Sequence, residues 1–344
     1  MPRVPLPLLA LALSAVSAPA ADPIKVGVIG LDNYQAVAFT ELYHNPKAEG
    51  DLKGLKVVAA VPAVSKEIAD SEKDAAKWVE AMTKLGVEVV KTPEEVLKKC
   101  DAVLVMSVDG RAHLEQLKPV LKAGKPVYVG RPLAASLADV VEIFRLAAES
   151  KTPIFSCSQH RFSPGFLGMK DHPDVGEVLG ADVYGGCPRE PHHPDLFWLG
   201  VHGVETLYTI LGPGCVSVSR TSTEVADVVA GEWKDGRVGT YRGIRKGALK
   251  YSATVFGAKG VSTAGIYGHG VPVKGVPPTD DKYMAYEATA VEIAKFFKTG
   301  KPPVSADETT ELFAFMEAAD ESKRQKGVPV KLAAVLEKAK AKKP

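Results

Sequence analysis

The sequence has few cysteines, little net charge and no apolar run of membrane-spanning length. Its four cysteines, at positions 100, 157, 187 and 215, are too few and too widely spaced for the disulfide scaffold of a small secreted domain. Whether Cys187 and Cys215 form a bridge stays open. The net charge of +2 over 344 residues gives no reason to expect nucleic acid or an anionic membrane as a partner. With 46% apolar residues, the chain can build two domains with cores of their own.

The N-terminal segment has the features of a secretory signal. Arg3 precedes an apolar run at 6–16, and Ala18-Pro19-Ala20 provides the small residues of a cleavage site. The run is too short to cross a bilayer of about 30 Å. We therefore expect residues 1–20 to be removed and the protein to be exported, to the periplasm or the extracellular space. The segment lacks a twin arginine, which indicates export of the unfolded chain.

Residues 22–155 alternate short apolar runs with amphipathic segments. An unbroken apolar run predicts a strand buried on both faces, as in a parallel sheet flanked by helices. The predicted strands are 26–29, 57–61, 102–106, 127–129 and 154–155, and the predicted helices are 34–44, 70–84, 94–99, 111–123 and 137–149. Strict alternation of strand and helix predicts a Rossmann-type, doubly wound parallel sheet.

A second domain, 156–344, is predicted where this alternation stops. Its strand-like runs are 178–184, 215–221, 224–233, 237–243 and 249–256, and its longer helices are 203–211, 283–299 and 307–326. Asp235-Gly236 between two such runs is a hairpin signal. The fold class is therefore α/β, with an α+β second domain built on an open, mainly antiparallel sheet.

The turn after the first strand bears on nucleotide binding. A dinucleotide fingerprint, G-x-G-x-x-G, uses its glycines so that backbone can approach the diphosphate closely. Here Gly30 is present, but Asp32 stands at the second glycine position and Gln35 at the third. An ionised carboxylate at that position repels a diphosphate. Asp32 and Asn33 have a second interpretation, as a cap for the helix that follows.

Six stretches follow one another in the order typical of one family. They are VGVIG at 26–30, HLEQLKPVLKAGKPVYVGRP at 113–132, QHRFSP at 159–164, DVGEVLGADVY at 174–184, GVHGVETLYTILG at 200–212 and FAFMEAADESKRQKGVPVKL at 313–332. Together they resemble the Gfo/Idh/MocA family of sugar and polyol oxidoreductases over nearly all of the expected mature chain. The resemblance implies a Rossmann domain that holds NAD or NADP, here at Gly27, Gly30, Asp32 and Asn33. It also implies homo-oligomers that pair through the second sheet.

Three motifs differ from the pattern of the family. Where relatives have Glu-Lys-Pro after the fifth strand, this chain has Gly130-Arg131-Pro132, and arginine cannot accept a proton because its pKa exceeds about 12. Where relatives have Asp-x-Gly-x-His, Trp198 replaces the aspartate and His202 is retained. Pro62 stands where an acidic residue would bind the ribose hydroxyls.

A substrate site is expected at the carboxyl ends of the parallel strands, facing the second domain. The catalytic candidates are His202, as general acid or base, and Arg131, as an orienting group. The candidates for substrate binding are His160, Arg161, His193, Asp195, Trp198 and Glu205. The alternative interpretation of His202 is that it only packs or caps at the start of its helix. A weaker alternative is a divalent metal held by His192, His193, His202 and Glu205, although their spacing matches no standard metal motif.

Three functions compete at the level of sequence. The first is an oxidoreductase that moves a hydride between a sugar or polyol and a nicotinamide, with His202 taking the hydroxyl proton. The second is a cofactor-independent lyase, hydratase or hydrolase of carbohydrates that uses His202 with Glu205 or Asp195. The third is a non-catalytic carbohydrate-binding protein. The order of motifs favours the first.

Overall fold

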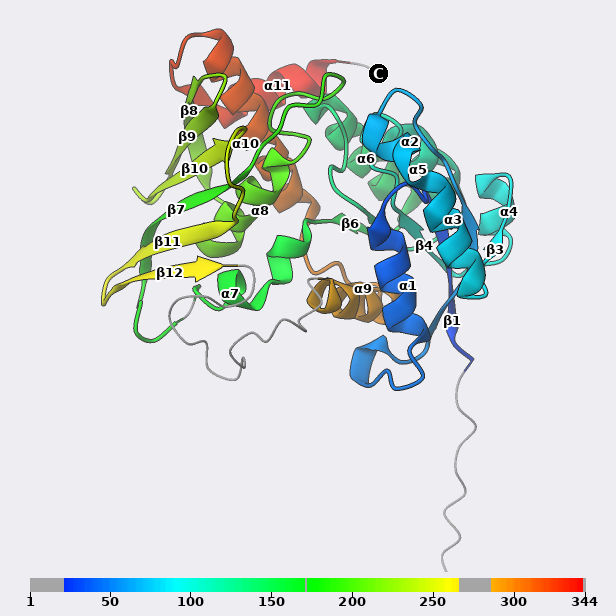
Figure 1. The fold of residues 1–344 in the computed structure, drawn as a ribbon. Coiled ribbons are helices and arrows are strands. Elements are labelled where there is room, and N and C mark those ends of the chain that lie inside the picture. The colour runs from blue at the N-terminus through cyan, green and yellow to red at the C-terminus, as the bar shows by residue number, and fades with distance from the viewer. Residues whose placement is uncertain (1–21, 171, 266–285, 343–344) are drawn as a thin grey trace, which may run out of the picture.

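The computed structural model describes residues 22–170, 172–265 and 286–342, which form two sheets with helices packed around them (Figure 1). The predicted secretory signal at 1–20 lies outside the described residues. None of the helices in the described ranges combines the length and the apolarity needed to cross a membrane.

The first sheet is parallel throughout, as the unbroken apolar runs predict. Its strands are β1 (Ile24–Ile29), β2 (Leu55–Val61), β3 (Glu88–Val89), β4 (Ala102–Val105), β5 (Val127–Val129) and β6 (Ile154–Ser156). They pair in the order β3-β2-β1-β4-β5-β6, which is the doubly wound arrangement. The order in which the strands are added therefore changes direction between β1 and β4, and such folds bind their ligands at this point. The sequence did not predict β3, which is only two residues long.

The helices of this half connect the strands. They are α1 (Tyr34–His44), α2 (Ala69–Lys73), α3 (Ala75–Lys84), α4 (Pro93–Leu97), α5 (His113–Lys122) and α6 (Leu137–Ser150). Asn33 caps α1 by accepting a hydrogen bond from the Gln35 amide, and Ser136 caps α6 in the same way through Asp139. The predicted helix at 70–84 is divided in two at Asp74.

Within the described ranges, the second sheet has seven strands. They are β7 (Val178–Gly186), β8 (Cys215–Ser222), β9 (Ala226–Trp233), β10 (Val238–Ile244), β11 (Ser252–Gly257), β12 (Val261–Gly265) and β13 (Val330–Lys331). Their order is β12-β11-β7-β10-β9-β8-β13, and every neighbouring pair is antiparallel except β7 with β10. The prediction of a mainly antiparallel sheet is confirmed. The short outer strands β12 and β13 were not predicted.

Helices α8 (Gly200–Leu211) and α10 (Ala306–Arg324) cover one face of the second sheet, and all residues of α8 are buried. The short helix α7 (Pro164–Leu167) and the C-terminal α11 (Leu332–Ala341) complete this half. Helix α9 (Glu287–Thr299) returns to the first half and packs beside α1. The division of the chain at residue 155 thus stays a prediction about sequence, and one later helix crosses it.

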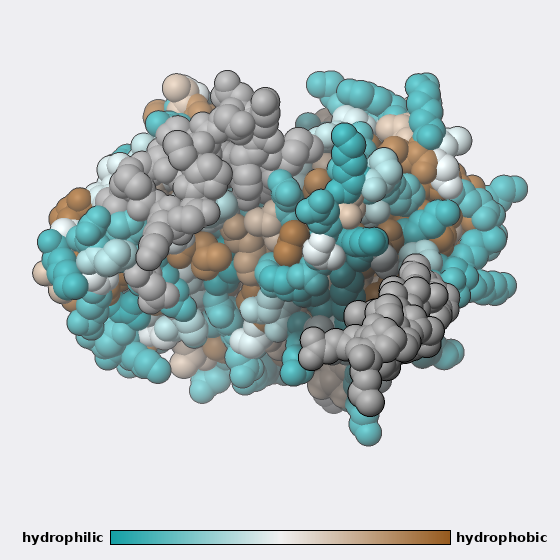
Figure 2. All heavy atoms as spheres, turned by 90° about the horizontal axis from the view of Figure 1, so that it is seen from below, coloured by the Kyte–Doolittle hydropathy of each residue, from teal (hydrophilic) through white to brown (hydrophobic). Residues whose placement is uncertain are grey.

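The described surface seen from below is mainly hydrophilic, with small apolar patches near its middle (Figure 2). The apolar side chains of the first half fill two cores, one on each face of its sheet. This burial on both faces fixes the strand ends, and with them the residues that follow each strand.

Candidate functional site

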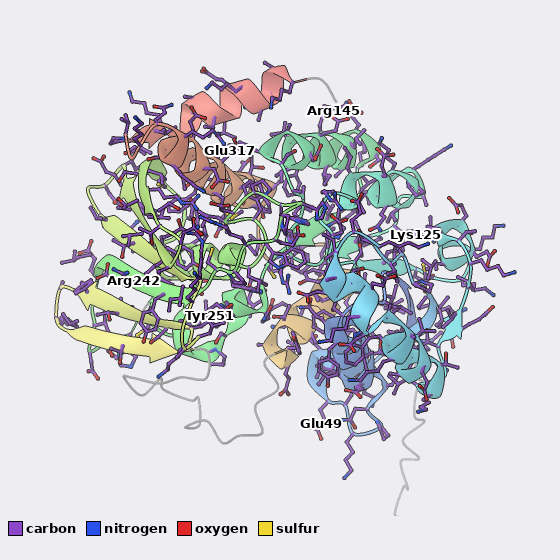
Figure 3. All side chains as sticks on the ribbon, turned by 45° about the horizontal axis from the view of Figure 1, so that its top comes forward. Glu49, Lys125, Arg145, Arg242, Tyr251 and Glu317 are labelled. Atoms are coloured by element: carbon purple, nitrogen blue, oxygen red, sulfur yellow. The ribbon has the colours of Figure 1, made fainter. Side chains whose placement is uncertain are left out.

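The candidate site is a cluster of five side chains from four segments, named here the Arg131 cluster. Arg131 follows β5, His160 lies in the 3-10 turn η2 (Gln159–Phe162) after β6, and His202 lies in the first turn of α8. Trp198 precedes α8, and Tyr251 precedes β11 between the second sheet and the first half (Figure 3). The structure thus brings four predicted residues together at the carboxyl edge of the parallel sheet, and adds Tyr251.

The rings of His160, His202 and Tyr251 lie in contact with one another. The ring centroids of His160 and His202 are 5.0 Å apart, and those of His160 and Tyr251 are 4.6 Å apart. The guanidinium carbon of Arg131 is 6.0 Å from the centre of the Trp198 ring. Arg131 is also close enough to both imidazoles for its charge to lower their pKa values.

His202 is buried and uncharged. Its pKa lies well below the ordinary value because burial disfavours the imidazolium, with repulsion from Arg131 and His160 adding to the effect. Nδ1 lies 2.5 Å from the Ser158 hydroxyl, and Nε2 has no hydrogen-bond partner among the described residues. A neutral imidazole with one engaged nitrogen can accept a proton at the other.

His160 supports His202 from the neighbouring turn. Its Nδ1 lies 3.2 Å from the Thr206 hydroxyl, one turn along α8 from His202. Burial, with repulsion from Arg131, lowers the pKa of His160 to about 4. Both imidazoles are therefore neutral near pH 7, so the positive charge of the cluster belongs to Arg131.

Arg161 and Glu205, both predicted to bind substrate, form a buried ion pair. Arg161 Nε lies 2.5 Å from Glu205 Oε1, and its Nη1 lies 2.6 Å from Glu308 of α10. Glu205 also accepts a hydrogen bond from the Ser158 amide, at 3.4 Å. The Ser158 hydroxyl contacts His202, so the Arg161–Glu205 pair positions His202 through Ser158. Both charged groups of the pair already bind each other, which leaves them unsuited to binding substrate directly.

Trp198, His193 and Asp195 lie in the loop before α8, and each contacts a different part of the protein. Trp198 packs on Ile68 and Val108, which follow β2 and β4. His193 Nδ1 lies 2.8 Å from Glu190, and its Nε2 accepts a hydrogen bond from the Gly110 amide at 3.2 Å. These contacts join the second half to the edge of the first sheet.

The structure places Asp195 in an ion-pair network with three arginines and Lys323. Its carboxylate is thus engaged outside the Arg131 cluster. The network anchors the loop that carries Trp198, three residues further along the chain.

The metal alternative finds no support in the described part of the chain, where no three His, Cys, Asp or Glu side chains gather in a way that could hold an ion. His192 contacts Glu190 at 2.8 Å and is about one-third exposed, while His202 and Glu205 have the partners given above. The four cysteines are free and buried, so Cys187 and Cys215 do not form a bridge.

The turn after β1 brings three segments together around Asp32. Its carboxylate accepts hydrogen bonds from the Val108 amide, at 3.1 and 3.2 Å, and from the Ser71 hydroxyl, at 2.7 Å. Gly30 has φ near +100°, and a Cβ there would lie 2.2 Å from the Ser107 amide nitrogen, so only glycine fits. Asp32 therefore links the turn after β1 to helix α2, which follows β2, and to the loop after β4.

The two other predicted cofactor residues have structural partners. Asn33 is the N-cap of α1, and its side-chain amide also donates to the Met106 carbonyl at 2.5 Å. Gly27 lies inside β1, where a Cβ would meet Val96 and Cys100 at less than 3 Å. Gly27 thus lets α4 pack closely on the sheet.

A dinucleotide fits this turn on one condition. The sheet order and Gly30 provide the scaffold, but the Val108 amide and the Ser71 hydroxyl, donors that would suit a phosphate, already bind the Asp32 carboxylate. Burial raises the pKa of Asp32, and the hydrogen bonds from Ser71 and Val108 only partly oppose this effect. The turn suits a diphosphate when Asp32 is protonated and repels it when Asp32 is ionised.

Two residues of the site were not predicted from the sequence. Ser158 immediately precedes the QHRFSP stretch, so its proximity to that motif was an available signal. Tyr251 gave no such signal, because it reaches the cluster through the pairing of β11 with β7.

Comparison with known proteins agrees with the fold. The model of an oxidoreductase family with an NAD-binding Rossmann fold, GFO_IDH_MocA, matches residues 24–156. Myo-inositol 2-dehydrogenase of Thermotoga maritima is 25% identical over 91% of this chain and 100% of its own length.

Solved structures extend the likeness to both halves of the chain. A probable dehydrogenase from Thermotoga maritima superposes with a TM-score of 0.70 at 23% identity, covering 91% of this chain and 100% of its own. GenD2 from gentamicin A biosynthesis, solved in complex with NAD, gives a TM-score of 0.70 at 18% identity, covering 90% and 96%. Together these matches support the assignment of the chain to the Gfo/Idh/MocA family of oxidoreductases.

Proposed function

We propose that this protein is an oxidoreductase that transfers a hydride between a carbon of a sugar or polyol and NAD or NADP. The observation that carries the proposal is a neutral, buried His202 with a free Nε2 beside the Arg131 cation, at the carboxyl edge of the Rossmann sheet. The NAD-binding family model and the inositol dehydrogenase among the relatives support the cofactor and the substrate class.

Three residues of the chain have different proposed roles around the substrate. Arg131 holds an oxygen of the substrate by hydrogen bonds and keeps its charge throughout. His202 accepts the proton of the reacting hydroxyl at Nε2, while the Ser158 hydroxyl at Nδ1 fixes the ring. Trp198 offers an apolar surface next to the guanidinium.

The residues that would hold the cofactor are those of the turn after β1. Gly30 and Asn33 shape the turn, and Asp32 with Val108 and Ser71 would face the diphosphate. When bound, the nicotinamide supplies the hydride acceptor. The departures from the family pattern, Asp32 above all, are part of the proposal and imply weak binding of the cofactor near neutral pH.

The Asp32→Asn variant should bind NADH about 10- to 100-fold more tightly than the wild type near pH 7.5, because a buried like charge next to the diphosphate is removed. Asparagine keeps an oxygen that can accept from Val108. In the wild type, protonation of Asp32 favours binding, so affinity should fall as pH rises, by up to about tenfold per unit. Calorimetric titration with NADH across pH measures both effects.

The matched control for this titration is Asp70→Asn, an exposed acid on α2. It should keep the affinity and the pH dependence of the wild type. Equal affinities for Asp32→Asn and wild type, with no dependence on pH, would contradict the role given to Asp32.

A direct test of the proposed function combines NAD(H) binding with turnover of a panel of sugars and polyols. Oxidation of a panel member with reduction of the cofactor supports the proposal, whereas no binding even to Asp32→Asn removes it. The ionisable Asp32 at the turn favours one other candidate, a cofactor-independent carbohydrate lyase, hydratase or hydrolase. Conversion of a carbohydrate without added cofactor would favour that candidate.

We also propose export and self-association. The charged and apolar pattern of residues 1–20 supports export, and N-terminal sequencing of the mature protein should begin at Ala21. The outer face of the second sheet supports a homo-oligomer, because it exposes apolar side chains to solvent, namely Val228, Val238, Phe256 and Val261. Light scattering that gives a monomer mass would remove that idea.

A further inference from the structure

Arg131 is a partly buried cation that forms no ion pair with any described residue. Its Nη1 atom is shielded from solvent and has no hydrogen-bond partner in the described structure. Arg161, Arg220 and Arg245 also have largely buried side chains, and each forms an ion pair with a carboxylate. A buried guanidinium cannot lose its proton, so a missing partner costs free energy that a ligand can restore.

The carboxylates around the cluster are already engaged with other groups. Glu205 binds Arg161, Asp109 binds Arg111 at 2.8 Å, Asp195 binds Arg220 at 2.7 Å, and Asp32 binds Ser71 and Val108. In the described chain no carboxylate forms an ion pair with Arg131, although the charge of Asp32 acts on it.

The other groups of the cluster leave its charge at +1. His160 and His202 are neutral, for the reasons given above. Burial raises the pKa of Tyr251, which keeps its hydroxyl protonated. The cluster therefore combines one cation, neutral polar groups and the Trp198 ring.

We propose that the substrate is a polyhydroxylated carboxylate, such as a sugar acid, and that Arg131 binds its carboxylate. This inference rests on the proposed function and names its substrate class. The planar guanidinium matches the two oxygens of a carboxylate, and a single positive charge balances a single negative one. A phosphate ester carries nearly two negative charges at neutral pH, which one guanidinium does not balance. The adjacent hydroxyl of the acid then meets His202.

Three probes of similar length separate charge from hydroxyl recognition. D-Gluconate has both groups, D-glucitol has hydroxyls with an alcohol in place of the carboxylate, and hexanoate has only the carboxylate. Calorimetry on the full-length mature protein, with and without NADH, should show that gluconate binds about 10- to 100-fold more tightly than glucitol. This is the difference in affinity expected from one charge-assisted, hydrogen-bonded pair. Hexanoate should bind more weakly than gluconate because it cannot contact the imidazoles.

Variants of Arg131 test whether this residue carries the preference. Arg131→Met should abolish the difference between gluconate and glucitol, and Arg131→Lys should keep part of it because the charge remains without the planar fork. Arg145→Met, on α6 and distant from Tyr251 (Figure 3), removes an exposed positive charge and should keep the full difference. Without ligand, Arg131→Met should melt at or above the temperature of the wild type, since it removes an unpaired buried charge.

The outcomes separate this inference from the proposed function. Equal affinity for gluconate and glucitol, a preference that survives in Arg131→Met, or no binding of gluconate each overturns the carboxylate site. Turnover of a neutral polyol without any preference for the acid leaves the oxidoreductase standing and removes the carboxylate site. A gluconate preference that depends on Arg131, in a protein that binds no NAD(H), supports the carboxylate site and removes the oxidoreductase.

Discussion

Replacing His202 with asparagine should lower kcat for a sugar or polyol substrate by about 10²- to 10⁴-fold, the usual contribution of a positioned general base. The asparagine amide can keep the contact with the Ser158 hydroxyl at the position of Nδ1. It has no group that can accept a proton at the position of Nε2. KM should change little, because the substrate oxygen is held by Arg131. Steady-state kinetics on both proteins, with thermal melts to compare their folds, measures the effect.

The pH dependence gives this prediction a second measurement. The pKa of His202 lies well below its ordinary value, so its imidazole stays neutral as the pH falls through 6.5, where an exposed histidine would become charged. Activity that depends on His202 should therefore persist below roughly pH 6, once the effect of Asp32 on cofactor affinity is saturated. Loss of less than tenfold in kcat for His202→Asn would exclude the role of general base.

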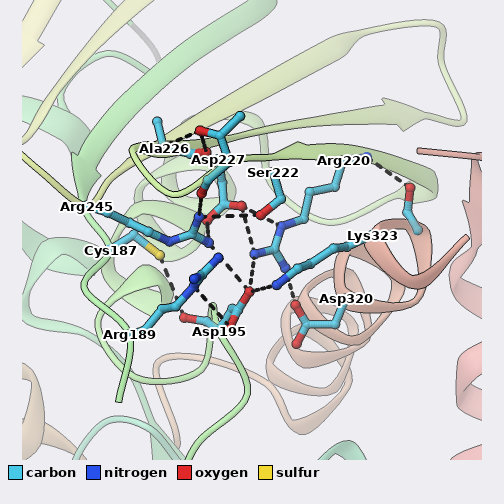
Figure 4. A network of polar contacts seen from close by, with 12 residues as sticks. Cys187, Arg189, Asp195, Arg220, Ser222, Ala226, Asp227, Arg245, Asp320 and Lys323 are labelled. Atoms are coloured by element: carbon cyan, nitrogen blue, oxygen red, sulfur yellow. Dashed lines mark hydrogen bonds and ion pairs between the residues drawn. The ribbon is translucent and has the colours of Figure 1, made fainter. Parts of the chain in front are cut away.

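Replacing Arg220 with methionine should lower the free energy of unfolding by about 3–5 kcal/mol, the cost of leaving buried charges uncompensated. Arg220 lies on β8, and its fully buried side chain reaches carboxylates of β9 and α10 (Figure 4). Nε donates to Asp227 at 2.9 Å, Nη2 lies 2.7 Å from Asp195, and Nη1 contacts Asp320. Without Arg220, these carboxylates would face one another. Urea unfolding measures the change.

The defect in Arg220→Met should be larger near pH 8 than near pH 6. Burial raises the pKa of Asp320 to about 7, so in the folded protein this carboxyl binds a proton more tightly than in the unfolded chain. Its burial thus lowers stability as the pH rises toward 7, and Arg220 offsets this cost once Asp320 is ionised. At pH 6 Asp320 is mostly protonated and loses less when Arg220 is removed.

A surface pair provides the control for this measurement. Arg237 contacts Asp235 at 2.8 Å, but both side chains are partly exposed. Arg237→Met should therefore change the free energy of unfolding by no more than about 1 kcal/mol. Equal effects of the two substitutions would mean that burial of Arg220 adds nothing to its pairing.

The parallel sheet could be predicted because its information is local. Each strand is an apolar run bounded by polar or glycine residues, and caps such as Ser136 mark where the next helix begins. The elements that escaped prediction depend on distant partners. β3 and β13 have two residues each and exist only because β2 and β8 provide hydrogen bonds. Helix α9 was predicted, but its place was not: it comes after β12 in sequence and buries Ile293 and Phe296 against the first half.

The sequence by itself determined the family, the parallel order of the first half and the candidates Arg131 and His202, because each rests on short stretches with a characteristic spacing. Only the tertiary structure decided which of the candidate side chains are already paired with other groups of the protein and which are available to a ligand. In the folded protein Glu205 forms an ion pair with Arg161, and Asp195 forms ion pairs with Arg220 and Lys323. Asp32 accepts hydrogen bonds from Val108 and Ser71. Charge balance inside a folded protein depends on which side chains meet across hundreds of residues, and that pairing left Arg131 as a cation without an ion pair among the described residues.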